Sequence, residues 1–262
     1  MKELLLGYNV QAQPLQVFAD HLYNSLFDPG LPEVAPRWLA CINPHSYAVA
    51  KHDFEFSQAL NSADWLIPDG AGILLASWIQ SGKICQRITG SDVFASMHEL
   101  MNQSAGLSVF FLGASQKTLA EICKRMARDY PNVRVAGTYS PAFKTAWTPD
   151  EQDAMVHAIN SVQPDVLWVG MTAPKQEKWI QENLPRLNIR FAAAIGAVFD
   201  FYAGNVQRSH PAFQRLGLEW LPRLIQQPRR LWRRMFVSAP IFVWDVLKER
   251  LKQSCSTSSS SR

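Results

Sequence analysis

Polar residues whose side chains could do chemistry follow short apolar segments of the sequence. Asp69 follows a run of Trp, Leu, Ile and Pro, and Asn43 follows residues 38–42. A carboxyl group at the end of an apolar strand is partly removed from water, which raises its pKa toward the range of a general base. The Asn43 amide can hold hydroxyl groups, and the planar fork of Arg87 matches phosphate oxygens. A simpler interpretation is that Asp69 opens an Asp-Gly turn in which Gly70 supplies backbone freedom.

The elements that must position these residues alternate between strands and helices. Short apolar runs predict strands at residues 38–42, 65–68, 108–112, 133–137, 166–170 and 191–195. Helical patterns lie between them, as at 117–130, where apolar residues recur at spacings of three and four. The alternation predicts an α/β fold, with a Rossmann-like, mostly parallel sheet and helices on both faces. Because ligands of such sheets bind beyond the carboxyl ends of the strands, one cleft should be bordered by Asn43, Asp69, Gly113, Gly170, Gly196 and Asp200.

The formal net charge of +4 conceals a division of the chain near Gln207. Residues 1–207 hold 15 Lys and Arg against 19 Asp and Glu, whereas residues 208–252 hold ten against three. We expect a catalytic α/β domain at 1–207, a basic amphipathic helical appendage at 208–253 and a disordered Ser-rich tail at 254–262. Such a basic appendage suits an anionic partner, which could be nucleic acid, a phospholipid surface or a pyrophosphate.

The composition argues against several classes of protein. The four cysteines show neither C-x-x-C spacing nor a regular framework, which disfavours a disulfide scaffold and favours a reducing cytosol. The sequence contains no cluster of Cys and His residues that would indicate a metal site. The N-terminus has too short an apolar run for a signal peptide, and no stretch reaches the roughly 18 apolar residues that cross a bilayer. Residues 235–244 come closest, but Pro240 interrupts them, so they could lie on a membrane without crossing it.

Several motifs, in the order and at the separations found here, resemble those of one enzyme family. They are Ile67-Pro-Asp-Gly-Ala-Gly, Arg87-Ile-Thr-Gly-Ser-Asp, Pro174-Lys-Gln-Glu-Lys-Trp, Phe199-Asp-Phe-Tyr-Ala-Gly with Arg208, and Leu216-Gly-Leu-Glu-Trp-Leu-Pro-Arg-Leu with Gln227-Pro-Arg-Arg. Together they resemble the WecG/TagA/CpsF glycosyltransferases, glycosyltransferase family 26. The resemblance implies an inverting transfer of a sugar from a UDP-sugar to a polyprenyl-diphosphate-linked saccharide. It also implies a location at the cytoplasmic membrane face and a product that feeds teichoic acid linkage units, enterobacterial common antigen or exopolysaccharide.

The resemblance implies roles for particular residues. Asp69 matches the proposed base of the family, and Arg87 matches the arginine of its R-x-x-G motif. No D-x-D pair follows an apolar strand, so no metal is predicted and arginine should neutralise the leaving diphosphate. Gln176 is implied as a contact to the donor sugar or a phosphate; the alternative is a helix cap and surface pair with Glu177. The family's C-terminal appendage is thought to fold over the active site and to present arginines there. The candidates are Arg215, Arg223 and Arg230, and the alternative for each is a position on a solvated basic face.

The sequence departs from the common family pattern around Asn43. Cys41 stands where Thr is frequent, and Pro44 and His45 stand where many members have Ala and Glu. A hydroxyl contact is lost and an imidazole gained, so UDP-glucose or UDP-glucuronate competes with UDP-N-acetylmannosamine as the donor. His45 could bind a carboxylate or hydroxyl of the sugar, share in proton transfer, or be simply structural.

The remaining predicted contacts concern the nucleotide. Asp200 could accept hydrogen bonds from ribose hydroxyl groups. Three glycines could let the backbone approach the nucleotide or could equally form tight turns, and they are Gly113, Gly170 and Gly196.

Two other classes of function share parts of this pattern. A dinucleotide-dependent oxidoreductase would have the same α/β rhythm, but no strand leads into G-x-G-x-x-G, and no cofactor is predicted. A non-enzymatic module could use the basic appendage and its tryptophans to bind single-stranded nucleic acid or a bilayer surface. The family motifs favour a transferase at an anionic membrane surface, peripherally attached on the cytoplasmic side, over a nucleic-acid binder. A homo-oligomer is possible.

Overall fold

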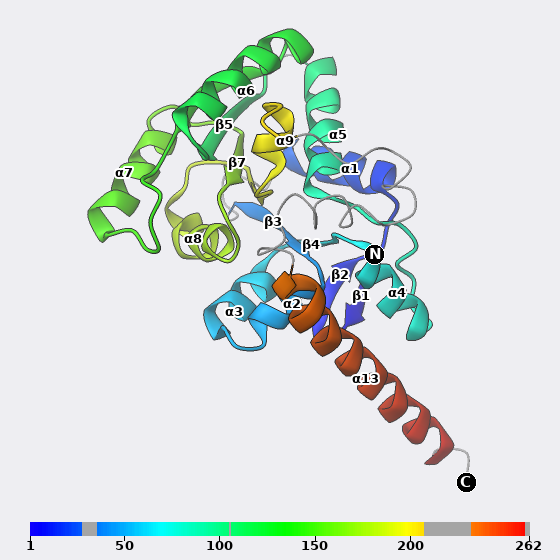
Figure 1. Cartoon of the computed structure of the whole chain (residues 1–262). Coiled ribbons are helices and arrows are strands. Elements are labelled where there is room, and N and C mark those ends of the chain that lie inside the picture. The colour runs from blue at the N-terminus through cyan, green and yellow to red at the C-terminus, as the bar shows by residue number, and fades with distance from the viewer. Residues whose placement is uncertain (28–35, 105, 207–231, 260–262) are drawn as a thin grey trace.

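A mixed sheet of eight strands organises the part of the chain that the computed structural model describes, which is residues 1–27, 36–104, 106–206 and 232–259 (Figure 1). The strand order is β1-β2-β4-β3-β8-β7-β5-β6. β1 pairs with β2 in the antiparallel sense, and the other described pairs are parallel. The strands are β1 (Lys2–Leu5), β2 (Tyr8–Gln11), β3 (Arg37–Ile42), β4 (Trp65–Pro68), β5 (Ser108–Gly113), β6 (Arg134–Tyr139), β7 (Val166–Gly170) and β8 (Phe191–Ala194).

This strand order creates a topological switch point between β3 and β8. From β3 the chain passes to β4 on one side, whereas it reaches β8 through β5, β6 and β7 on the other side. The register pairs Ile42 with Pro68 and Val169 with Ala194, so the carboxyl ends of β3, β4, β7 and β8 meet at one edge. Open α/β sheets bind their ligands in the crevice at such a point.

Helices cover both faces of the sheet (Figure 1). One face carries α1 (Leu15–Asn24), α5 (Gly90–Gln103), α6 (Gln116–Asp129) and α9 (Val198–Tyr202). The other carries α2 (Pro44–Ala50), α3 (Phe54–Ser62), α4 (Ala71–Ile79), α7 (Pro149–Asn160), α8 (Lys175–Asn183) and α13 (Ala239–Ser259). Single turns complete the described chain, the 3-10 turns η1 (Ser25–Phe27) and η2 (Leu184–Arg186) and the π-helical turn η3 (Arg234–Ser238).

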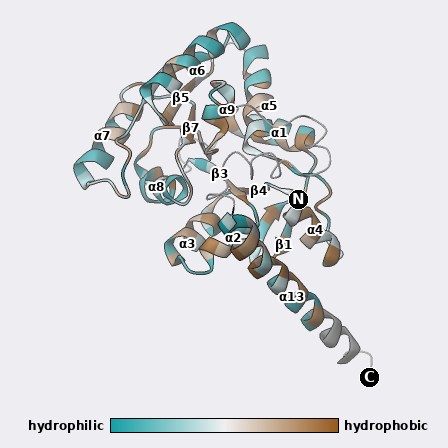
Figure 2. Ribbon diagram, viewed as in Figure 1, coloured by the Kyte–Doolittle hydropathy of each residue, from teal (hydrophilic) through white to brown (hydrophobic). Residues whose placement is uncertain are grey.

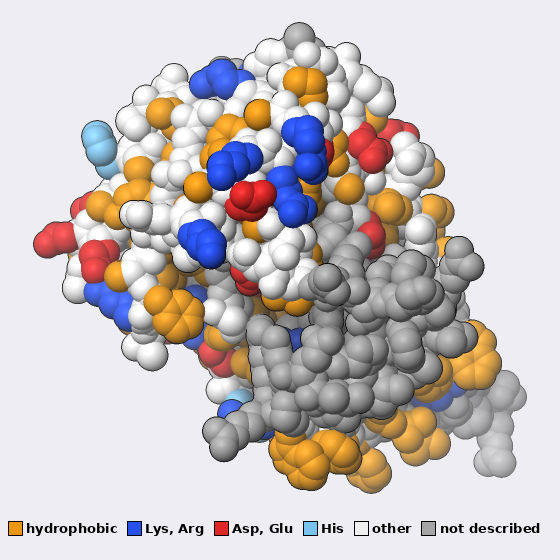
Figure 3. Space-filling model, turned by 45° about the horizontal axis from the view of Figure 1, so that its top comes forward, with side chains coloured by type: hydrophobic (Ala, Val, Ile, Leu, Met, Phe, Trp, Pro, Cys, Tyr) orange, Lys and Arg blue, Asp and Glu red, His pale blue; other side chains and the backbone are white. Residues whose placement is uncertain are grey.

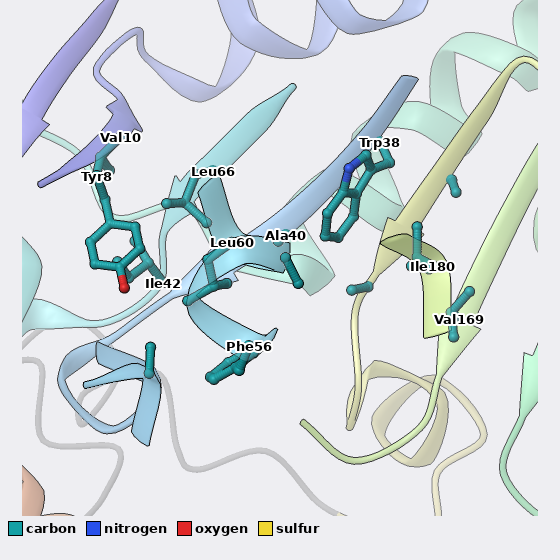
Figure 4. Packing of buried hydrophobic residues seen from close by; sticks show 14 of the residues in the cluster. Tyr8, Val10, Trp38, Ala40, Ile42, Phe56, Leu60, Leu66, Val169 and Ile180 are labelled. Atoms are coloured by element: carbon teal, nitrogen blue, oxygen red, sulfur yellow. The ribbon is translucent and has the colours of Figure 1, made fainter. Parts of the chain in front are cut away.

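Each face of the sheet has its own hydrophobic cluster. On the α5 side, Leu119, Ile122 and Met126 of α6 pack inward because their spacing of three and four places them on one side of that helix. The outer surface of α6 is largely hydrophilic, while hydrophobic residues concentrate in the strands (Figure 2). On the other face, Phe56 and Leu60 of α3 pack among residues of the sheet and of α8 (Figure 4). The other residues of this cluster that Figure 4 labels are Tyr8, Val10, Trp38, Ala40, Ile42, Leu66, Val169 and Ile180.

The predicted α/β fold with helices on both faces is confirmed, and the predicted strands agree with the observed ones to within two residues. The strands β1 and β2 are not predicted by the sequence pattern. Each has four residues, too few to show a strand pattern, and they are joined at Leu6 and Gly7, both with positive φ. Only pairing with each other and with β4 makes them strands.

The C-terminal helix extends further than the sequence indicated. α13 continues to Ser259, past residue 254, where the predicted disordered tail begins. Adding a residue to an existing helix gains a backbone hydrogen bond without a new nucleation step, so a serine run can prolong a helix that packing has started. The predicted domain boundary near Gln207 lies outside the described residues.

A buried histidine occupies the core on the α5 side. The Nδ1–H of His98 donates to the Phe94 carbonyl oxygen at 2.8 Å, and Nε2 has no hydrogen-bond partner among the described residues. The ring lies against the aromatic rings of Phe94, Tyr130 and Trp168. Burial lowers the pKa of His98 to about 3 because the charged imidazolium would lose its hydration.

We expect His98 to make the fold sensitive to acid. Its pKa falls from 6.5 to about 3 on folding, so its contribution to stability is complete above pH 6.5 and is lost as the pH falls toward 3. Lowering the pH from 7 to 5 should therefore reduce the free energy of unfolding by about 2 kcal/mol through this residue. Chemical denaturation of the wild type and His98→Phe at both pH values measures the difference.

The same substitution at His157, which is exposed on α7, is the control and should leave the pH dependence of the wild type unchanged. An identical pH dependence in wild type and His98→Phe would contradict the expected role of His98.

Candidate functional site

A cavity of about 350 Å³ opens at the carboxyl ends of the central strands. Its walls come from the residues that follow β3, β4, β7 and β8 and from the first turn of α5. Seven of the predicted site residues line it, and they are Cys41, Asn43, His45, Asp69, Gln176, Gly196 and Asp200.

Asn43 begins α2 and lines the cavity at the end of β3. Its amide oxygen accepts hydrogen bonds from the backbone N–H groups of His45 and Ser46 at 3.0 and 2.9 Å. The Ser46 hydroxyl accepts from the Asn43 N–H in return, which completes a capping box. The cap uses the amide oxygen, so a contact with a ligand hydroxyl would use the amide nitrogen.

Asp69 lies beside Asn43 because their strands are in register. The Asp69 N–H donates to the Ile42 carbonyl oxygen at 2.8 Å, which fixes the turn after β4 to the end of β3. Gly70 then adopts a φ of 115°, which favours glycine, and α4 begins at Ala71. Asp69 is half-buried and lines the cavity.

The first turn of α5 forms another wall. Thr89 caps this helix by accepting from the Asp92 N–H at 3.2 Å, and the Asp92 carboxylate accepts from the Thr89 N–H at 2.8 Å. A Cβ atom at Gly90 would lie 3.3 Å from the side chains of Ile195 and Val198, so the helix end packs closely against the residues after β8. Arg87 is half-buried two residues before Thr89, but it is not among the residues that line the cavity.

Gln176 and Glu177 form a hydrogen-bonded chain at the beginning of α8. The Gln176 amide nitrogen donates to Glu177 Oε1 at 2.9 Å, and the Gly196 N–H donates to the Gln176 amide oxygen at 3.0 Å. Both side chains are buried and line the cavity. Burial raises the pKa of Glu177 from its usual 4.5 to about 7 because no cation is paired with the carboxylate among the described residues.

Cys41 lies at the floor of the cavity, between the two carboxyl-bearing walls. Its thiol donates to the Ala194 carbonyl oxygen at 3.7 Å. Burial and the nearby charges of Asp69 and Glu177 raise the pKa of the Cys41 thiol well above its usual value. The protonated thiol is therefore a packing group or a weak donor, without nucleophilic character.

The C-terminal segment reaches the cavity through η3. The His45 ring nitrogen Nδ1 and the buried Ser238 hydroxyl are hydrogen-bonded at 2.8 Å. Arg234, one turn earlier in η3, lines the cavity. Arg234 belongs to the predicted appendage but is not among the arginines predicted as site residues.

The contacts that hold α13 against the domain come from the other end of α2. The Asp245 carboxylate accepts from the Tyr47 hydroxyl at 2.9 Å and from Lys51 Nζ at 2.5 Å. Although burial alone would raise it, these two hydrogen bonds lower the pKa of Asp245 below its usual value. Phe242 and Val246 are buried against the same region, with the Phe242 ring 5.4 Å from that of Tyr47. Helix α2 thus contacts the cavity with its first turn and the C-terminal helix with its last.

The other predicted residues are placed differently. A Cβ atom at Gly113 would lie 2.6 Å from the Gly170 carbonyl oxygen, and one at Gly170 would lie 2.3 Å from the Phe199 ring. These two glycines therefore permit close packing of β5, β7 and α9, and neither lines the cavity. Arg215, Arg223 and Arg230 lie outside the described residues.

Sequence reasoning missed the importance of Glu177. The sequence predicts no role for Glu177 itself, and a surface pair with it is only the alternative to a ligand contact of Gln176. The structure instead buries the side chain, with a relative exposure of 2%. The signal that could have indicated this burial is its position three residues before Ile180, which packs inward, because residues at that spacing share one face of a helix.

The described residues provide two further findings. No three His, Cys, Asp or Glu side chains among them are grouped closely enough to hold a metal ion. None of the described helices has the length and apolar character needed to span a membrane.

The fold and the cavity define a class of enzyme. A parallel sheet with a ligand cavity at its switch point, lined by carboxyl groups and helix N-termini, is typical of α/β enzymes that act on nucleotide-bearing substrates. The sequence profile of the glycosyl transferase WecG/TagA/CpsF family matches residues 5–256. The chain therefore belongs to this family and is a glycosyltransferase, which confirms the resemblance seen in the motifs.

Individual members of the family are similar along most of their length. The chain is 31% identical over 234 residues to a Bacillus spizizenii protein, covering 89% of this chain and 86% of that one. It is 29% identical over 235 residues to a Bacillus subtilis protein, covering 90% and 87%, and 25% identical to a Staphylococcus aureus protein, covering 90% and 85%. Each of the three is named N-acetylglucosaminyldiphosphoundecaprenol N-acetyl-beta-D-mannosaminyltransferase.

We expect the buried carboxyl group of Glu177 to destabilise the protein at alkaline pH. Its pKa is higher in the folded state, so its contribution to stability is complete below pH 4.5 and is lost as the pH rises through about 7. Glu177→Gln removes this titration. Relative to the wild type, the variant should gain roughly 2 to 3 kcal/mol in free energy of unfolding between pH 5 and pH 8.

Denaturant unfolding at the two pH values measures this gain. Glu182→Gln, an exposed change on the same helix, is the control and should show no gain. A Glu177→Gln variant with the pH dependence of the wild type would show that the carboxyl group is not held neutral by burial.

Proposed function

We propose that this glycosyltransferase moves a sugar from a UDP-sugar to a polyprenyl-diphosphate-linked saccharide, with inversion at the anomeric carbon. The observation that carries the proposal is one cavity that unites a half-buried carboxylate, Asp69, with the N-terminal ends of α5 and α8 and with Arg234. This set supplies what inverting transfer needs, namely a base for the acceptor hydroxyl and positive charge for the departing nucleotide. The volume of about 350 Å³ lies within the range of small-molecule sites.

The proposed reaction is a single displacement. Asp69 takes the proton of the acceptor hydroxyl group while the oxygen of that hydroxyl group bonds to the anomeric carbon. At the same time the bond from the anomeric carbon to the UDP oxygen breaks. The negative charge on the leaving diphosphate is stabilised by Arg234 and by the backbone N–H groups of the first turn of α5. Asp200 accepts from the ribose hydroxyl groups. Arg87 remains a candidate for the leaving group, as do the appendage arginines predicted from the sequence.

The names of the relatives support particular substrates. Each is named for the transfer of an N-acetyl-β-D-mannosaminyl group to N-acetylglucosaminyl-diphosphoundecaprenol. This favours UDP-N-acetylmannosamine as the donor and a diphosphoundecaprenol-linked sugar as the acceptor. Cys41 and His45 line the cavity, which supports an effect of these departures from the family pattern on the choice of donor. A thermal-shift panel of UDP-N-acetylmannosamine, UDP-N-acetylglucosamine, UDP-glucose and UDP-glucuronate separates the candidates.

Asp69→Asn tests the base. The amide keeps the shape of the side chain and removes its basicity, so kcat should fall by about 100-fold or more while the affinity for the donor changes little. Transfer to a polyprenyl-diphosphate-linked acceptor measures kcat, and calorimetry measures donor affinity. Asp150→Asn, an exposed change in the first turn of α7, is the matched control. Transfer by Asp69→Asn at the wild-type rate would exclude Asp69 as the base.

The lipid-linked acceptor requires a membrane surface, and the structure offers an apolar one. Apolar side chains on α4, η3 and α13 are exposed, and the exposed fractions of Trp78 and Trp244 reach 76% and 68%. α4 contacts α13, and hydrophobic side chains gather along the lower edge of the space-filling view (Figure 3). We call this the apolar surface of α4 and α13, and its members are Leu75, Trp78, Trp232, Phe236, Val237, Val243, Trp244, Leu247 and Leu251.

The apolar surface of α4 and α13 supports peripheral attachment to an anionic bilayer at the cytoplasmic face. The inward side of α13 is already occupied by Phe242 and Val246, so its exposed apolar side chains have no partner in the described part of the domain. Lys248 and Lys252 on the same helix supply basic charge for anionic headgroups. Tryptophan is well suited to the boundary between headgroups and acyl chains.

Trp78→Ser/Trp244→Ser tests this attachment. We expect the double variant to lose most of its flotation with anionic liposomes, because two large apolar contacts are replaced by polar groups. Binding of the wild type should weaken as salt is added. Phe143→Ser is the control, since Phe143 is 96% exposed but lies in the segment before α7, away from α4 and α13. Unchanged flotation of the double variant, or preferential binding of oligonucleotides, would contradict a membrane role for this surface.

A further inference from the structure

One carboxyl oxygen of Glu177 is buried without a hydrogen-bond partner among the described residues. The carboxyl group lines the cavity and is buried to 98% of its surface, with a relative exposure of 2%. Oε1 accepts the hydrogen bond from Gln176, but Oε2 has no hydrogen-bond partner among the described residues. The next residue, Lys178, does not pair with it, because Lys178 Nζ contacts Asp53 and Glu55 at 2.7 and 2.9 Å.

Such burial is unfavourable to folding. A buried acceptor without a donor loses its hydrogen bonds to water, and a buried carboxylate without a cation also loses its hydration as an ion. Polar groups left in this state inside ligand cavities are candidates for ligand contacts, because the ligand can supply the missing partner. Above pH 7 the carboxyl group is ionised and has acceptors only, so the partner that Oε2 then lacks is a hydrogen-bond donor.

The location of Glu177 indicates which part of a substrate it faces. Asp69 follows β4, on one side of β3, whereas Gln176 ties Glu177 to the end of β8, on the other side. Both carboxyl groups act on the thiol of Cys41 at the cavity floor, so both lie close to the same point of the crevice. Arg234 and the first turn of α5 suit the diphosphate, whereas an unpaired carboxylate would repel it. Asp200 is assigned to the ribose hydroxyl groups, and Asp69 acts at the anomeric carbon, so a carboxyl group near the same point faces the hydroxyl groups of the transferred sugar.

We propose that Glu177 binds a hydroxyl group of the transferred sugar through Oε2, and that Gln176 holds the carboxyl group in position by linking it to the backbone N–H of Gly196. The proposal rests on the proposed function, because it takes a UDP-sugar as the ligand. Glu177 is then a residue for sugar recognition, distinct from Asp69, which acts on the acceptor.

The test compares a nucleotide with and without its sugar. In Glu177→Gln the amide oxygen can still accept from Gln176, so an NH₂ donor takes the place of the acceptor Oε2. We expect the affinity for UDP, measured by calorimetry at pH 8, where the wild-type carboxyl group is ionised, to stay within about twofold of the wild type. The affinity for the UDP-sugar that the wild type binds best in the four-donor panel should fall by about tenfold or more, as is typical when a hydrogen bond to a charged group is lost.

Two further variants complete the design. Glu182→Gln, on the exposed side of α8, should leave both affinities unchanged. Glu177→Asp keeps an acceptor but withdraws it from the cavity, so it should weaken the UDP-sugar and spare UDP in the same way. It also keeps the test decisive if Glu177→Gln fails to unfold cooperatively.

Equal affinities of Glu177→Gln and wild type for both ligands would overturn the proposal. Equal losses for UDP and for the UDP-sugar would overturn it as well, because they would indicate a nucleotide contact or a structural role. A wild type that binds none of the four UDP-sugars would instead contradict the proposed function, so the two failures are distinguishable.

Discussion

The parallel pairing of β3 between β4 and β8 is the constraint on which the rest of the site depends. Backbone hydrogen bonds fix the register of these strands, so the residues that follow them emerge at the same height. The bond from the Asp69 N–H to the Ile42 carbonyl oxygen extends this order by one residue, and the bond from the Gly196 N–H to Gln176 extends it on the other side. Residues that are far apart in the sequence therefore line one cavity.

Helix α2 connects this cavity to the C-terminal helix. Its first turn carries Asn43 and His45 at the cavity, and the residues near its end, Tyr47 and Lys51, hold Asp245 of α13. α2 has only seven residues, so all of these contacts lie within about two helical turns of one another. If the apolar surface of α4 and α13 rests on a bilayer as proposed, the short helix α2 would connect that surface to the cavity that acts on the lipid-linked saccharide.

The two carboxyl groups of the cavity differ in environment rather than in type. Asp69 is half-buried on a turn that the sheet positions, whereas Glu177 is fully buried and linked to the backbone through Gln176. Burial of Glu177 without a cation lowers stability in the neutral range, which is the kind of cost found at functional sites. Two acids in unlike surroundings can serve unlike purposes at the same pH. Cys41, between them, is held as a neutral thiol by the same charges.

The sequence alone determined the α/β class, six of the eight strands and seven of the residues that line the cavity, because strand periodicity and polar residues after strand ends are local signals. It could not determine β1 and β2, whose four-residue lengths carry almost no pattern and which exist through pairing. It also could not show that Gly113 and Gly170 face neighbouring atoms rather than a ligand, since that depends on how Phe199 packs. Only the tertiary structure decided that Glu177 is buried and that Arg234 reaches the cavity, because burial and proximity arise from elements that meet in space and not along the chain.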